Sequence, residues 1–198
     1  MNRRQIFCGL GLAAALSLAA CSGPYNFGAD VRTFGTWPEG RAPGSYAIER
    51  LPSQQQDEQQ IEMEKLATAA LEKAGFKLAD DPKGADVLVT LGARVNLQDR
   101  APWDDPLWWR WHGNINVWRF GPGMRGYPMG WDERRYDREV ALLLRDRKSS
   151  EPLYEARASS DGLSAGSPQV FAALFSASMG DFPKSESKVH RIVVQAER

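Results

Sequence analysis

The sequence predicts an α+β fold, in which a mostly antiparallel sheet carries two amphipathic helices packed on one face. Three observations lead to this fold class. Several segments alternate apolar and polar residues, two segments repeat apolar residues every three to four positions, and these helical segments stand between strand segments. Of the 198 residues, 42% are hydrophobic and 25% are charged, which suits one globular domain. A segment rich in Trp and Gly lies between strands as an insertion.

The strands are predicted from apolar residues that recur at every second position. In the longest expected strand, Val87 and every second residue through Leu97 are apolar and share one face. Residues 136–147 and 153–160 alternate in the same way on either side of a short polar turn, which predicts a β-hairpin. The expected strands are residues 31–37, 45–51, 76–79, 86–97, 136–147, 153–160 and 188–195.

Two amphipathic helices are predicted from a repeat close to 3.6 residues. The first is expected to begin at Ser53, which has the spacing of a capping box with Gln56, and to end before Gly75. The second is expected to begin at Ser167, where a proline follows at the first helical position, and to end near Gly180. In the first helix the apolar stripe is Met63, Leu66, Ala67, Ala70, Leu71 and Ala74, and the residues expected to face water include Glu62, Glu64 and Lys65.

The first twenty residues are expected to be a removable leader and not part of the fold. Arg3 and Arg4 precede an apolar run over residues 6–18, and the arginine pair leaves open the general or the twin-arginine export route. A helix that spans a bilayer core of ~30 Å needs about 20 residues, so this shorter run fits a signal peptide. The expected organisation is a signal peptide at residues 1–20, a lipidated tether at 21–30 and a single domain at 31–198, with the insertion at 101–131.

The leader ends in Leu18-Ala19-Ala20-Cys21, which resembles the lipobox of bacterial lipoprotein signals. The resemblance implies cleavage between Ala20 and Cys21 and attachment of diacylglycerol to the Cys21 thiol. Because Ser22 follows the cysteine where an aspartate would retain the protein in the inner membrane, the resemblance also implies the outer membrane, with the domain facing the periplasm. An ordinary secretory signal, in which Cys21 carries no lipid, is the alternative.

Charge and residue counts argue against several classes of partner and cofactor. Basic and acidic residues number 25 each, and removal of the leader with its two arginines leaves a net charge of −2. A nucleic-acid binder normally carries a basic excess, so no nucleic acid is expected as a partner. The cysteines are Cys8 and Cys21, and His112 and His190 are far apart in the chain, so no metal site and no cofactor are predicted.

Six of the seven tryptophans lie within residues 101–131, together with five glycines and four prolines. Glycine and proline at this density prevent one continuous helix or strand. Three interpretations stay open: the rings form a small core of their own, they bind a protein or glycan partner, or they lie at a membrane interface. The candidate binding surface consists of Trp103, Trp108, Trp109, Arg110, Trp111, Trp118, Tyr127 and Trp131.

No segment of the sequence is interpreted as the catalytic motif of a common hydrolase class, so a non-enzymatic protein is expected. The chain lacks the HExxH spacing of zinc hydrolases. Residues 162–166 match Gly-x-Ser-x-Gly in letters, but Ser164-Ala165-Gly166-Ser167 is interpreted as the turn that caps the second helix and not as the nucleophile turn of a serine hydrolase. The alternative is a hydrolase of an envelope glycan such as peptidoglycan, because two carboxylates can serve as acid and base in glycoside cleavage. Its candidate carboxylates flank the Trp-rich segment: Asp104, Asp105, Asp132 and Glu133.

The order of the segments forms a pattern of its own. A predicted strand that ends at Trp37 follows the lipobox, and a predicted strand pair further along the chain has Asp146 in its turn. The other characteristic segments are residues 46–55 (YAIERLPSQQ), 70–76 (ALEKAGF), 85–89 (ADVLV) and 180–183 (GDFP). Over residues 30–195 this order resembles the domain-of-unknown-function 4136 family of bacterial envelope lipoproteins, although Tyr154 stands where many members have tryptophan. The resemblance implies an α+β fold, export and a lipid anchor, and it supplies no catalytic residue.

Overall fold

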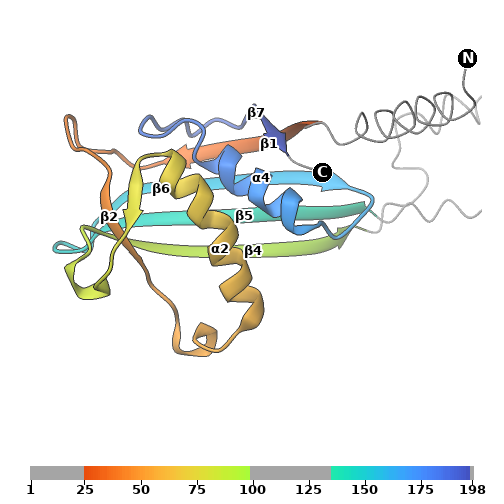
Figure 1. Ribbon diagram of the computed structural model, residues 1–198. Helices are drawn as coiled ribbons and strands as arrows, with labels where there is room; N and C mark the ends of the chain where they lie inside the picture. Colours follow the sequence, from red (N-terminus) through yellow and green to blue (C-terminus); the bar gives the residue numbers. More distant parts are fainter. Residues whose placement is uncertain (1–24, 99–134, 197–198) are drawn as a thin grey trace, which may run out of the picture.

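The computed structural model describes residues 25–98 and 135–196, which form one seven-stranded sheet with two α-helices (Figure 1). The strands are β1 (Tyr25–Phe34), β2 (Gly44–Ile48), β3 (Phe76–Leu78), β4 (Val87–Gln98), β5 (Arg135–Asp146), β6 (Pro152–Gly162) and β7 (His190–Ala196), and the α-helices are α2 (Glu58–Lys73) and α4 (Pro168–Ser178). The α+β class predicted from the sequence is confirmed. In the described part of the chain, no helix has the length and apolarity needed to cross a membrane.

The sheet is mixed, whereas the sequence predicts a mostly antiparallel one. Its strand order is β3-β2-β4-β5-β6-β1-β7. From β4 to β7 each neighbouring pair is antiparallel, but β2 lies parallel to both β3 and β4. Helix α2 lies between β2 and β3 in the chain and returns it to the end of the sheet where β2 began, so the strands on either side run the same way. Alternation along one strand carries no information about the direction of its neighbour.

The hydrophobic core lies between the sheet and the two helices, which cover the same face (Figure 1). We call this the helix face of the sheet and the other the open face. The fully buried side chains of the central strands β4, β5 and β6 all belong to the helix face: Val87, Val89, Val140, Leu142, Leu144, Tyr154, Ala156 and Ala158. On the open face, ion pairs join Arg94 to Glu139 and Arg145 to Glu49. In β4 the face assignment predicted from alternation is confirmed as far along the strand as Leu91, which is 4% exposed.

Helix α2 begins at Glu58, five residues after the predicted start at Ser53. Asp57 is the N-cap, because its carboxylate accepts the backbone N–H of Gln59 at 2.9 Å and of Gln60 at 3.4 Å. Ser53 instead lies in a short 3-10 helix, Pro52–Gln54. The predicted end is confirmed, since Gly75 follows the helix with a φ of 95°, a conformation that favours glycine.

Glu64 does not face water as predicted, because it is only 5% exposed. The Arg50 guanidinium, just after β2, contacts both carboxylate oxygens, with Nε donating to Oε1 at 2.7 Å. Gln60 donates a further hydrogen bond to the same carboxylate at 3.2 Å. This partner comes from outside the helix, so the helical repeat alone could not reveal that the carboxylate is compensated on burial.

Strand β1 begins at Tyr25, earlier than the start predicted at Val31. Residues 25–30, which the sequence assigned to a tether, pair with β7 from Tyr25↔Ala196 onward. Phe27 and Ala29 are buried on the helix face. The strand was underestimated because glycine and asparagine occupy its open-face positions, where a strand needs no apolar side chain.

Candidate functional site

The residues that the sequence singles out for function lie outside the described residues. They are Ala20 and Cys21, the binding candidates Trp103, Trp108, Trp109, Arg110, Trp111, Trp118, Tyr127 and Trp131, and the carboxylates Asp104, Asp105, Asp132 and Glu133. His112 also lies outside them. The seventh tryptophan, Trp37, is a core residue, with its ring 4.8 Å from that of Phe182.

The strands that flank the Trp-rich segment form the longest ladder of the sheet. β4 and β5 pair through twelve successive residues, from Val87↔Asp146 to Gln98↔Arg135. Because β1 and β5 are both antiparallel to β6, they run in the same direction, and Tyr25 and Arg135 therefore begin at the same end of the sheet. We call this the insertion end. The opposite end, where Asp146 leads into the β5–β6 turn, is the turn end.

At the insertion end the two faces of the sheet differ in chemistry. On the helix face, Val95 is 41% exposed and Leu97 is 46% exposed, because neither helix extends over them. On the open face, Arg135 pairs with Asp161 at 3.1 Å. A polar cavity of about 200 Å³ lies beside that pair on the open face, and Asp30 and Arg94 are among its lining residues.

Arg138 is a buried cation of the insertion end, with 6% of its surface exposed. Its Nη2 donates to the backbone carbonyl of Asp161 at 2.6 Å. Gly162 leaves room for this guanidinium, because a Cβ at that position would lie 2.5 Å from Nη2. The Arg138 side chain, from β5, therefore adds a contact to the last residues of β6.

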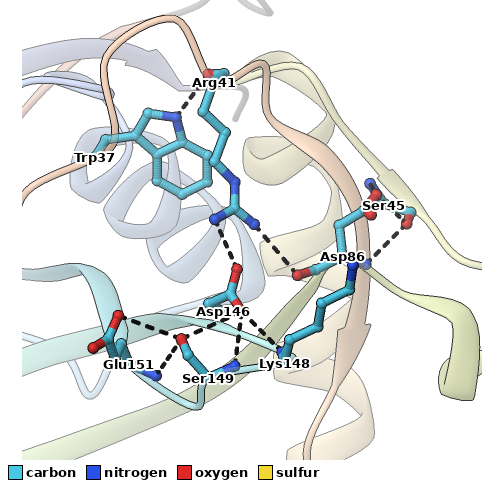
Figure 2. A network of polar contacts seen from close by, with 8 residues as sticks. All are labelled: Trp37, Arg41, Ser45, Asp86, Asp146, Lys148, Ser149 and Glu151. Carbon is cyan, nitrogen blue, oxygen red and sulfur yellow. Dashed lines mark hydrogen bonds and ion pairs between the residues drawn. The ribbon is translucent and has the colours of Figure 1, made fainter.

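A polar network occupies the turn end (Figure 2). Arg41, in the loop between β1 and β2, donates to Asp146 at 2.8 Å. Ser149 and Lys148 donate their backbone N–H groups to the other oxygen of the same carboxylate at 3.0 and 2.8 Å. Asp86, before β4, accepts the Ser45 hydroxyl at 2.7 Å. The network thus joins three connections that are far apart in the sequence.

Two carboxylates of this network, those of Asp146 and Asp86, have a lowered pKa. Hydrogen bonding from the Ser149 backbone, followed by the Arg41 side chain, lowers the pKa of Asp146 to about 2. The hydrogen bonds from Ser45 lower the pKa of Asp86. A general acid must carry a proton near neutral pH, and these groups are ionised there. The hydrogen bonds of the network hold the turn end together, and its ionised Asp146 and Asp86 are not suited to act as general acids.

His190 pairs with Asp181, a contact that sequence reasoning missed. Its Nε2 lies 2.7 Å from an Asp181 carboxylate oxygen and its Nδ1 lies 3.1 Å from the Lys188 carbonyl. Both ring nitrogens face acceptors, so the Lys188 carbonyl and then Asp181 raise the pKa of the imidazole. Among the residues that the structure describes, no three His, Cys, Asp or Glu side chains are arranged to hold a metal ion.

The family model of a domain of unknown function, DUF4136, matches residues 25–184. The chain belongs to the DUF4136 family. The match begins with the first residue of β1 and ends after α4, so it takes in the turn-end network and both strands that flank the Trp-rich segment. No curated protein matches the sequence.

Two kinds of solved structure are similar to this DUF4136 chain. A PelC dodecamer from Paraburkholderia phytofirmans is 12% identical, with a TM-score of 0.44 over 76% of this chain and 95% of that chain. A PDZ domain protein from Parabacteroides distasonis is also 12% identical, with a TM-score of 0.49 over 93% of this chain and 42% of that chain. At TM-scores below 0.5, neither similarity bears on the function of the DUF4136 chain.

Proposed function

We propose that this DUF4136 protein is a bacterial cell-envelope lipoprotein, anchored through Cys21 in the outer membrane and facing the periplasm. In this proposal the protein is not an enzyme. It is a binding module whose Trp-rich segment contacts a protein or glycan partner. The observation that supports it is the β4–β5 ladder, whose twelve successive pairs end at Gln98 and Arg135, the residues on either side of the segment.

A long antiparallel ladder is a suitable scaffold for a recognition segment. Binding residues commonly lie on connections between rigid elements, because the scaffold limits the entropy lost on binding. β4 and β5 are held on the helix face by buried residues such as Val89 and Leu142, both fully buried. Trp and Arg are the residue types most enriched among those that dominate binding energy at interfaces. A cluster of both on such a ladder supports recognition as its role.

The anchor is tested by fractionating cells that express Cys21→Ala. The wild type is expected in the membrane fraction with a diacylglycerol mass on its N-terminal peptide, and Cys21→Ala is expected in the soluble periplasmic fraction. Cys8→Ala is the matched control, since Cys8 lies in the leader and its loss leaves fractionation unchanged. Mature Cys21→Ala protein that stays in the membrane fraction would contradict lipidation at this residue.

The binding role is tested with the double variant Trp108→Ala/Trp109→Ala. Truncating a dominant interface residue costs about 2 kcal/mol, or roughly 30-fold in the dissociation constant. We expect at least this loss in retention on purified peptidoglycan or in crosslinking to envelope proteins. Phe34→Ala, which removes an aromatic ring 37% exposed on the open face, is the control. Equal retention and crosslinking for all three proteins would refute the binding role.

A further inference from the structure

Three exposed leucine and valine side chains gather at the insertion end of the sheet. Val95 and Leu97 lie near the end of β4, and Leu163 directly follows β6 and is 69% exposed. Leu97, Tyr136 and Gly162 occupy one row across β4, β5 and β6, so the backbone at Gly162, the residue before Leu163, lies about 10 Å from that of Leu97 at the usual strand spacing. We call Val95, Leu97 and Leu163 the end patch.

The position of the end patch relative to the lipid-bearing residue follows from chain length. Tyr25 begins β1 at the insertion end, and Cys21 precedes it by four residues. Four residues span at most about 14 Å when fully extended. A chain anchored at Cys21 therefore keeps this end of the sheet within that distance of the bilayer, whatever the orientation of the domain.

The chemistry of the end patch suits the boundary between lipid and water. Its side chains are aliphatic, the neighbouring Tyr136 is half-buried, and the nearby cation Arg138 already donates to a backbone carbonyl. The carboxylate of Asp161 belongs to the open face, where Arg135 neutralises it. Exposed apolar side chains beside a tyrosine are the composition found where proteins contact the headgroup region.

We propose that the end patch contacts the headgroup region of the membrane that carries the anchor. The inference rests on the proposed lipidation of Cys21 and adds an orientation to it. The insertion end of the sheet lies on the lipid surface, and the turn end points into the periplasm. β4 has twelve residues, so the turn-end network of Figure 2 then stands about 35 Å above the lipid surface.

The orientation is tested by fluorescence quenching in the full-length lipidated protein. Leu163→Cys and Leu97→Cys are labelled with the environment-sensitive dye NBD and reconstituted into vesicles of phosphatidylethanolamine and phosphatidylglycerol. A fraction of the lipid carries a nitroxide quencher just below the headgroup. Leu78→Cys is the matched control, since Leu78 is 56% exposed and its partner Tyr46 also pairs with Val87, the turn-end residue of β4.

We expect a blue-shifted emission and about threefold stronger quenching at Leu163 and Leu97 than at Leu78, which lies about 35 Å further from the lipid. Circular dichroism confirms that each labelled variant keeps the wild-type fold. Equal quenching at all three positions on protein whose Cys21 is lipidated would overturn the orientation alone. Mass spectrometry that finds Cys21 unmodified would instead overturn the anchor, and with it the orientation.

Discussion

Two adjacent leucines on β5 provide a sharp test of the two-layer architecture. Leu142 is fully buried on the helix face, between Leu91 of β4 and Ala156 of β6. Leu143 points to the open face and is partly exposed, opposite Thr90 and Glu155. Replacing each by alanine removes the same atoms from the two sides of one strand.

The expected cost of each substitution follows from its surroundings. Leu→Ala in a core costs 2–5 kcal/mol, and we expect about 3 kcal/mol for Leu142→Ala, because the flanking strands are hydrogen-bonded and cannot close the cavity. We expect about 1 kcal/mol or less for Leu143→Ala, because water already reaches that side chain and fills the space left by it.

The measurement is equilibrium unfolding of the mature domain in urea, followed by far-ultraviolet circular dichroism. With a slope of about 2 kcal/mol per molar urea, Leu142→Ala lowers the midpoint by about 1.5 M and Leu143→Ala by about 0.5 M or less. Equal losses for the two variants would refute the reasoning, because they would mean that the open face is covered as well as the helix face.

The corrected start of α2 predicts that Asp57→Ala costs about 1 kcal/mol in urea unfolding, whereas Ser53→Ala costs less than about 0.3 kcal/mol; the reverse order would restore Ser53 as the cap. Gly75→Ala is expected to cost about 1 kcal/mol, because its φ of 95° strains any Cβ, and an unchanged thermal midpoint would contradict this. For His190, the Lys188 carbonyl and then Asp181 raise the pKa in the folded state, so the stabilisation is complete below about pH 6.5 and is lost as pH rises through the folded pKa. The stability difference between wild type and His190→Gln is therefore expected to shrink from pH 5.5 to pH 8.5, and a constant difference would argue against a charged pair.

Periodicity was enough to locate the strands and helices, because each depends on residues that are neighbours in the sequence. Alternation from Val87 to Leu91 identifies the buried face of β4, and Gly75 marks the end of α2. The segment ending at Cys21 that resembles a lipobox is likewise a local pattern, so the expected anchor follows from the sequence without knowledge of the fold. The Trp-rich candidate site is local in the same sense, and its residues lie outside those that the structure describes.

Long-range contacts decided the features of the fold that the sequence patterns did not predict. The Arg41–Asp146 contact joins residues 105 positions apart, and the burial of Glu64 depends on an arginine from another element. The parallel placement of β2 and the early start of β1 depend on which strand lies alongside. Val95 and Leu97 continue the apolar alternation of β4 yet stay exposed, because only the packing of the helices determines where the cover ends. A sequence pattern indicates the conformation that a segment favours. The contacts that the segment makes with other elements decide which of its faces and charges are buried.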